Sequence, residues 1–185
     1  MGFPDRIERV VEIAHPPAKV WAALTTAEGL GSWFGNQATI DLRPGGSAQM
    51  TWTGGHTADM RVERVEEPTV FGFTWHIYGL PDDDPRRTYV EFTLEPAGAG
   101  TRLTVVETGF AQLPEDAYRK AYDGNTQGWA SELGELVDYL DAPDIEAIAE
   151  QVFVALADPS RRAILAALAR DWDGPLDALR DHLSR

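Results

Sequence analysis

The chain has 185 residues and a formal net charge of −14, and it contains no cysteine. This length allows one sizeable domain with a smaller addition, the acidic balance argues against general binding to nucleic-acid backbones, and the lack of thiols excludes disulfides and thiolate chemistry. No run approaches the ~18 apolar residues of a membrane span, and no apolar leader opens the chain, so we expect a cytoplasmic protein without a membrane partner.

The chain opens with a predicted strand that is followed at once by helices. Apolar residues alternate over residues 7–13 and predict a half-buried strand. Pro16-Pro17 ends this strand, because proline has no N–H to donate to a ladder. Helical spacing then predicts one helix over residues 18–25 and a second over 27–32. A strand, two short helices and then a long all-β stretch is an order typical of folds built around an internal cavity.

The middle of the chain alternates as antiparallel strands do. Six further strands are predicted, joined mainly by hairpins with glycine-rich turns. They are expected at Ala38–Leu42, Ala48–Trp52, Met60–Val62, Phe71–Ile77, Val90–Leu94 and Leu103–Val105.

A long helix is predicted after the last strand. Pro114 suits its first turn, and apolar residues at helical spacing continue to Leu140. Gly124 and Asn125 weaken the middle. The segment is therefore expected to form one helix over residues 115–141, or two helices with a break at this glycine.

Seven short motifs in this order carry a family resemblance. They are Pro16-Pro17-Ala18-Lys19-Val20-Trp21-Ala22-Ala23-Leu24-Thr25, Trp33-Phe34-Gly35, Asp41-Leu42-Arg43-Pro44-Gly45-Gly46, Phe71-Gly72-Phe73-Thr74-Trp75, Gly100-Thr101-Arg102-Leu103-Thr104, Gly109-Phe110 and Gly128-Trp129. With them, residues 5–141 resemble the START-like (SRPBCC) superfamily, and within it proteins similar to the C-terminal domain of the heat-shock-protein-90 ATPase activator (AHSA-type). The resemblance implies an α+β helix-grip fold, in which a curved seven-stranded antiparallel sheet surrounds a long C-terminal helix. The superfamily includes lipid carriers, cyclases, hormone receptors, toxin-sequestering proteins and co-chaperones, so the fold alone does not decide the function.

The aromatic residues fit either a plain hydrophobic core or the lining of a ligand cavity. Ligand pockets are typically lined by aromatic and apolar side chains with a few polar groups. The candidate ligand-binding residues are Trp33, Phe34, Trp52, Met60, Phe73, Trp75, Tyr78, Phe92, Trp129 and Leu133. Candidate polar groups are Gln49, Thr51, His56, His76, Tyr78 and Asn125, although His76 also fits a surface cross-strand partner.

Catalytic and metal-binding patterns are sparse. No two of the four histidines stand at metal-ligand spacing, and Asp82-Asp83-Asp84 fits a charged hairpin loop better than a calcium site. No serine has the glycine setting of a nucleophile elbow. We therefore assign no catalytic residue, metal or cofactor from the sequence.

A second unit is predicted beyond a composition break at Asp141-Ala142-Pro143-Asp144, which divides the chain into residues 1–142 and 143–185. The stretch Phe153–Leu168 resembles the opening helices of ArsR-type winged-helix regulators, but the chain ends before a recognition helix and wing. This tail has five basic and eight acidic residues, so DNA binding is not expected. Its apolar face needs cover, either from the first domain or from a second chain in a homodimer.

Three functions remain open from the sequence. The first is a binding module that holds a small hydrophobic or aromatic molecule in an internal cavity. The second is a non-catalytic interaction protein, co-chaperone-like or regulatory, that dimerises through its helical tail. The third is a cyclase or hydrolase, for which the sequence shows no acid–base pair. A titratable group with a displaced pKa inside a cavity would favour the third.

Overall fold

The computed structural model describes residues 4–77, 79–81, 83–143 and 145–157. The chain divides into one compact unit that ends at Asp141 and a second that begins at Ala142.

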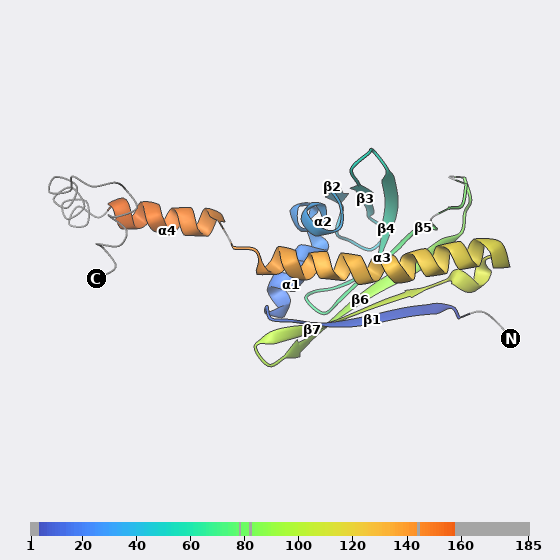
Figure 1. The fold of residues 1–185 in the computed structure, drawn as a ribbon, viewed down its shortest axis with the longest axis horizontal. Coiled ribbons are helices and arrows are strands. Elements are labelled where there is room, and N and C mark those ends of the chain that lie inside the picture. Colours follow the sequence, from blue (N-terminus) through green and yellow to red (C-terminus); the bar gives the residue numbers. More distant parts are fainter. Residues whose placement is uncertain (1–3, 78, 82, 144, 158–185) are drawn as a thin grey trace, which may run out of the picture. The chain divides into compact units, whose positions relative to one another are not determined.

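The first unit is a seven-stranded sheet with three α-helices (Figure 1). In chain order its elements are β1 (Arg6–Ile13), α1 (Pro17–Thr25), α2 (Ala27–Trp33), β2 (Gln37–Ile40), β3 (Ser47–Thr51), β4 (Thr57–Glu66), β5 (Val70–His76), β6 (Arg87–Ala97), β7 (Gly100–Thr108), the short 3₁₀ helix η1 (Phe110–Gln112) and α3 (Glu115–Asp141). This confirms the predicted α+β helix-grip fold, a curved antiparallel sheet around a long helix.

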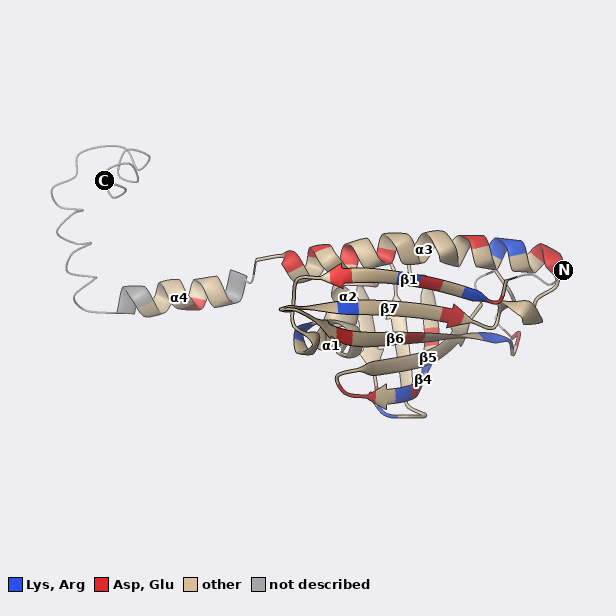
Figure 2. Ribbon diagram, turned by 90° about the horizontal axis from the view of Figure 1, so that it is seen from below, with Lys and Arg blue, Asp and Glu red and all other residues tan. Residues whose placement is uncertain are grey.

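The strands follow the order β1-β7-β6-β5-β4-β3-β2, and every neighbouring pair is antiparallel. Strands β2 to β7 run as successive hairpins, whereas β1 pairs with the last strand, placing Arg6 opposite Thr108 and Ile13 opposite Thr101. The first and last strands in the chain, β1 and β7, are therefore neighbours, and α3 follows β7 after the short helix η1 (Figure 1). Acidic and basic residues are scattered along α3 and the strands (Figure 2).

Helix α3 is continuous through Gly124 and Asn125, so the alternative of two helices with a break at this point is wrong. Its buried residues recur at helical spacing and include Tyr118, Trp129 and Leu136. Burial of this face against the sheet stabilises the helix more than one glycine weakens it, since an interior glycine costs only about 1 kcal/mol relative to alanine. Trp129 lies on this face and is 2% exposed.

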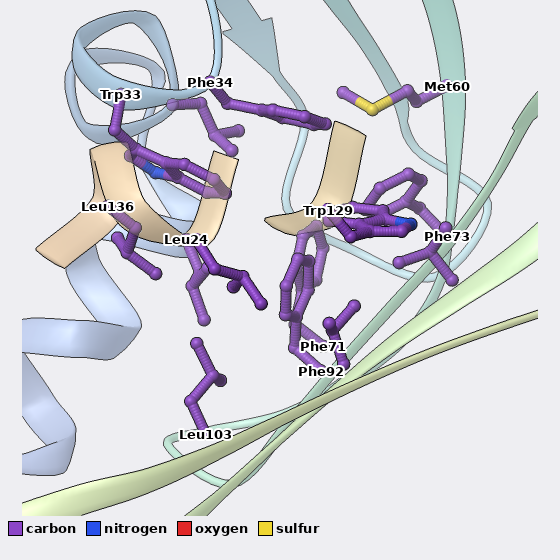
Figure 3. Packing of buried hydrophobic residues seen from close by; sticks show 14 of the residues in the cluster. Leu24, Trp33, Phe34, Met60, Phe71, Phe73, Phe92, Leu103, Trp129 and Leu136 are labelled. Carbon is purple, nitrogen blue, oxygen red and sulfur yellow. The ribbon is translucent and has the colours of Figure 1, made fainter. Parts of the chain in front are cut away.

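The core lies between the sheet, α3 and the helix pair α1–α2 (Figure 3). The two short helices pack closely at Gly29, where a Cβ atom would come within 2.6 Å of the Ala23 carbonyl oxygen. The indole N–H of Trp33 donates to the same carbonyl group at 2.9 Å. This contact fixes α2 and the residue that follows it, Phe34, at one end of the core.

In the second unit the structure describes one helix, α4 (Ile145–Ala157). Its exposed apolar side chains include Ile148, Val152, Phe153 and Val154. The predicted second helix of the tail lies outside the described residues, and so does most of the ArsR-like stretch. Within the described part of the chain, no helix combines the length and apolar character needed to cross a bilayer.

Candidate functional site

A cavity of about 820 Å³ lies between strands β4–β6 and the middle of α3. The chain segments after α2, β3 and β5 complete its wall. Its lining residues are Phe34, Trp52, Gly55, His56, Thr57, Ala58, Asp59, Trp75, His76, Gly79, Leu80, Arg87, Gly124, Asn125, Gly128, Trp129 and Glu132. The site thus combines four large aromatic rings with seven charged or polar side chains.

The aromatic rings of the cavity contact one another. Phe34 stacks on Trp129 with ring centroids 5.6 Å apart and planes 24° apart, as the close-up shows (Figure 3). Phe34 also lies 5.8 Å from Trp75 and meets Trp52 edge-on at 5.9 Å. Phe34 and Trp129 are buried, whereas Trp52 and Trp75 are half-buried. Each ring is therefore held by its neighbours, and two of them keep part of their surface open.

Two glycines on α3 leave the cavity open on the helix side. Gly124 and Gly128 are one helical turn apart, and both line the cavity. A Cβ atom built on either residue would meet no atom within 4 Å. Side chains at these positions would project into the empty space, so their absence contributes directly to its volume.

A buried carboxyl group lies behind the aromatic wall. Glu107 of β7 is 0% exposed. Its Oε1 accepts hydrogen bonds from Thr88 Oγ1 at 2.6 Å, Trp75 Nε1 at 2.9 Å and Asn125 Nδ2 at 2.9 Å. Its Oε2 accepts from Trp129 Nε1 at 2.7 Å. The Glu107 side chain therefore links its own strand, β7, to β5, β6 and α3.

The environment of Glu107 has opposing effects on its ionisation. Burial raises the pKa of this carboxyl group above its ordinary value, while the four hydrogen-bond donors act in the opposite direction. Three of the donors, on Trp75, Trp129 and Asn125, belong to residues that line the cavity. Glu107 thus orients the cavity wall from behind, because it fixes the N–H edges of both indoles.

A second carboxyl group faces the cavity itself. Glu132 is half-buried on α3, one turn beyond Gly128. Desolvation raises the pKa of Glu132 to about 7, with a smaller contribution from the nearby Glu135. Among the described residues, Glu132 makes no hydrogen bond or ion pair that would compensate its burial. This combination of an unpaired acid and an aromatic cavity is typical of a functional site.

The raised pKa of Glu132 predicts a pH-dependent loss of stability. The group is protonated in both folded and unfolded chains below its ordinary pKa of 4.5, and between 4.5 and about 7 the folded chain holds the proton more tightly. Stability contributed by this proton is therefore lost as the pH rises through about 7. We expect Glu132→Gln to raise the melting temperature at about pH 8 and to change it little near pH 4. Equal shifts at both pH values would contradict the assignment.

The structure divides the predicted ligand-binding residues into two groups. Phe34, Trp52, Trp75 and Trp129 line the cavity. The predicted residues that are buried in the core and are not among the lining residues are Trp33, Met60, Phe73, Phe92 and Leu133. Tyr78 lies outside the described residues.

The predicted polar groups divide in the same way. His56, His76 and Asn125 line the cavity, and His76 Nε2 lies 2.8 Å from the Pro81 carbonyl oxygen. Gln49 and Thr51 instead line a separate depression of about 520 Å³ near α2, β2 and β3. The described residues contain no group of three His, Asp or Glu side chains placed to hold a metal ion.

Comparison with solved structures identifies similar folds. A protein from Mesorhizobium loti, MLL2253, is 29% identical over 76% of this chain and 99% of its own length, with a TM-score of 0.65. CalU16 from Micromonospora echinospora is 24% identical over 79% of this chain and 82% of its own, with a TM-score of 0.57. The Aha1 dimer from Colwellia psychrerythraea is 21% identical over 75% and 98%, with a TM-score of 0.60. The last two likenesses establish the fold alone.

A search among curated proteins finds no match. The family model described as "Activator of Hsp90 ATPase homolog 1-like protein" matches residues 14–141. This match runs from the end of β1 to the last residue of α3, so it includes every residue that lines the cavity. The chain therefore belongs to the family of activator of Hsp90 ATPase homolog 1-like proteins.

Proposed function

We propose that the protein is a binding module that holds a small apolar or aromatic molecule in the cavity between the sheet and α3. The observation that carries this proposal is the cavity itself, about 820 Å³ in volume and walled by four aromatic rings. Cavities of roughly 300–1,000 Å³ with apolar walls and a few polar groups are the usual binding sites for molecules of this size. The family name refers to activation of a chaperone ATPase, but the feature that stands out in this chain is the cavity.

The wall is organised before any ligand arrives. Glu107 holds the indole N–H groups of Trp75 and Trp129, and Phe34 stacks on Trp129. Because these rings are already fixed, a ligand that lies against them does not have to order them, which lowers the entropic cost of binding. Rigid aromatic walls therefore support binding of a flat, apolar molecule.

Filling the cavity from α3 tests this proposal. We expect Gly128→Phe to weaken binding of the neutral dye N-phenyl-1-naphthylamine about 10-fold or more, because the new ring occupies the space that the dye needs. The same substitution should not destabilise the fold and should gain up to about 0.5 kcal/mol, since phenylalanine is a better helix former than glycine. Dye fluorescence gives the affinity, and chemical denaturation gives the stability.

Gly134 supplies the matched control. It lies on the same helix, a Cβ atom built on it would meet no atom within 4 Å, and it is not among the cavity-lining residues. Gly134→Phe should therefore leave dye affinity at the level of the unaltered protein. If Gly128→Phe and Gly134→Phe bind the dye equally well, the dye does not occupy this cavity and the proposal fails.

The pKa of Glu132 favours a second candidate function. A carboxyl group that titrates near 7 can take or give a proton at physiological pH, so acid–base catalysis of the cyclase or hydrolase kind is the alternative. A suitable probe is 2-tetralone, whose α-protons exchange with deuterated water when a base removes them. Exchange that the protein accelerates and that Glu132→Gln abolishes would support catalysis, and unaccelerated exchange would leave binding as the function.

We also propose that the chain forms a homodimer through its helical tail. Val152, Phe153 and Val154 of α4 are between 51% and 69% exposed, and such a short unit buries little apolar area by itself. Sedimentation of the full chain should therefore show a dimer, and a chain that ends at Ala142 should sediment as a monomer. Two monomers would contradict the proposal.

A further inference from the structure

We propose that the cavity selects ligands in which a basic nitrogen, such as an aliphatic amine or a quaternary ammonium group, is attached to the apolar or aromatic body. This inference rests on the proposed binding function and adds the charge of the ligand. It is carried by the juxtaposition of an unpaired carboxyl group, Glu132, with four aromatic rings in one cavity.

Glu132 lacks a partner among the described residues. The carboxyl group is half-buried on the cavity wall, and no described residue donates a hydrogen bond to it or pairs with its charge. A neutral apolar ligand would remove still more water from this group without replacing it, which costs free energy. A ligand ammonium group would supply both charge and N–H donors, and a charge-assisted hydrogen bond of this type is about twice as strong as a neutral one.

The cavity lining contains two other charged side chains, Asp59 and Arg87. Asp59 adds a second carboxylate to the lining, and its Oδ1 accepts a single hydrogen bond, from Gln49 at 2.7 Å. Arg87 is the one lysine or arginine among the lining residues. Its Nη1 atom donates to the carbonyl oxygens of Asp84 at 2.6 Å and Arg86 at 2.8 Å, so this nitrogen is held by its own loop.

The hydrogen bonds of two indoles determine which part of each ring a ligand can contact. Trp75 and Trp129 both donate their N–H groups to Glu107. Trp129 is buried under Phe34, so the half-buried Trp75 offers the open indole surface, and its N–H edge is already engaged. What remains for a ligand is its ring face, which carries the negative part of the aromatic quadrupole and attracts cations. A carboxyl oxygen that accepts the N–H hydrogen bond also polarises the indole, which makes the ring face more negative. Tryptophan is the best of the aromatic residues for this interaction.

Three compounds with one aromatic body test the inference. They are 2-(2-naphthyl)ethylamine, the corresponding alcohol and 2-naphthylacetic acid, titrated calorimetrically at about pH 8. At this pH an aliphatic amine is protonated, and Glu132, with its pKa of about 7, is mostly ionised. We expect the amine to bind about 10-fold or more tighter than the alcohol, as one charge-assisted hydrogen bond predicts, and the acid to bind most weakly.

Substitutions on α3 then assign the preference to one group. Glu132→Gln should reduce the ratio of amine to alcohol affinity to about 2 or less, while leaving the affinity for the alcohol within about the same factor. Glu135→Gln is the matched control, because Glu135 is an exposed neighbour on the same helix that does not line the cavity. This variant should keep the preference for the amine.

The pH profile supplies a further readout. Affinity for the amine should rise between about pH 6 and pH 8 as Glu132 loses its proton. His56 and His76 also line the cavity, and both are unchanged in Glu132→Gln. The remaining charged groups around the site, Asp59 and Arg87 in the lining, Glu107 behind it and Glu135 beside it, are unchanged in Glu132→Gln, so the part of the slope that this variant removes belongs to Glu132.

The outcomes separate the inference from the function on which it rests. Equal affinity for the amine and the alcohol would overturn the inference and leave the binding function in place. Tightest binding of the acid would overturn it as well, and would assign selectivity to His56, His76 and Arg87. Failure of all three compounds and of the neutral dye to bind would overturn both. A preference for the amine that survives in Glu132→Gln would show that the carboxyl group has been assigned wrongly.

Discussion

Glu107→Ala is expected to lower the free energy of unfolding by about 3–5 kcal/mol, because several buried neutral donors lose their acceptor at about 1–3 kcal/mol each. The substitution leaves the indole N–H group of Trp129, the amide of Asn125 and the hydroxyl group of Thr88 without their acceptor. The indole N–H group of Trp75 loses one of its two acceptors and keeps Thr88 Oγ1 at 2.8 Å. Each unsatisfied buried donor carries a cost of its own. Urea denaturation followed by circular dichroism gives the midpoint and slope from which the loss is obtained.

Glu107→Gln is the control that separates the effect of the side chain's shape from the effect of its hydrogen bonds. The amide oxygen of glutamine can replace Oε1, which accepts three of the four hydrogen bonds. Its NH₂ group then faces the N–H group of Trp129, so two hydrogen-bond donors replace the donor–acceptor pair that Trp129 Nε1 and Glu107 Oε2 form. We expect a loss of about 1–3 kcal/mol. A loss below about 1 kcal/mol for Glu107→Ala would mean that cavity water satisfies the donors, and Glu107 would then have no role in fixing the wall.

The sheet could be predicted from the sequence because its physical signal is local. The side chains of an antiparallel strand point alternately to the core and to solvent. The spacing of apolar residues such as Phe71, Phe73 and Val90 therefore indicates that they face the core. The helix was equally clear from its apolar spacing, except at Gly124. Helix propensity alone predicts a weak point at this glycine, but burial of the neighbouring face keeps the helix intact.

The alternation also contained a signal for Glu107 that the sequence interpretation did not use. Leu103 and Val105 predict the inner face of the last strand, and the next residue of the same period is Glu107. An acidic residue at an inward position is costly unless it is hydrogen-bonded, and it therefore marks a site. Its partners could not be predicted, because Thr88, Trp75 and Asn125 come from three different elements and meet only in the folded chain.

The extent of the cavity depends on packing and not on residue type. Phe73 and Phe92 are as aromatic as Trp75, but they fill the core and do not line the cavity. The difference lies on the opposite side of the space, where α3 presents Gly124 and Gly128. Sequence patterns identify the inner face of each element, but they do not show which inner residues lie opposite a glycine and so remain open to a ligand.

Trp129→Ala is expected to lower the free energy of unfolding by about 3–5 kcal/mol, the usual cost of truncating a large buried aromatic residue. The indole is 2% exposed, stacks on Phe34, meets Phe92 edge-on at 5.7 Å and donates to Glu107. Its removal therefore leaves a void in the core, takes away one wall of the cavity and frees one oxygen of a buried carboxyl group. A denaturation midpoint that does not change would show that the assigned face of α3 is wrong.

Trp129→Phe separates the hydrogen bond from the packing. Phenylalanine keeps an aromatic ring against Phe34 but has no N–H group for Glu107 Oε2. We expect a smaller loss, about 1.5–3 kcal/mol, which is the range for a hydrogen bond to a charged group. In a Glu107→Gln background the same substitution should cost less, because its partner atom has already been replaced, and this non-additivity measures the coupling between the two residues. Strictly additive losses would mean that the ring and the carboxyl group stabilise the fold independently, and the cavity wall would then be held by packing alone.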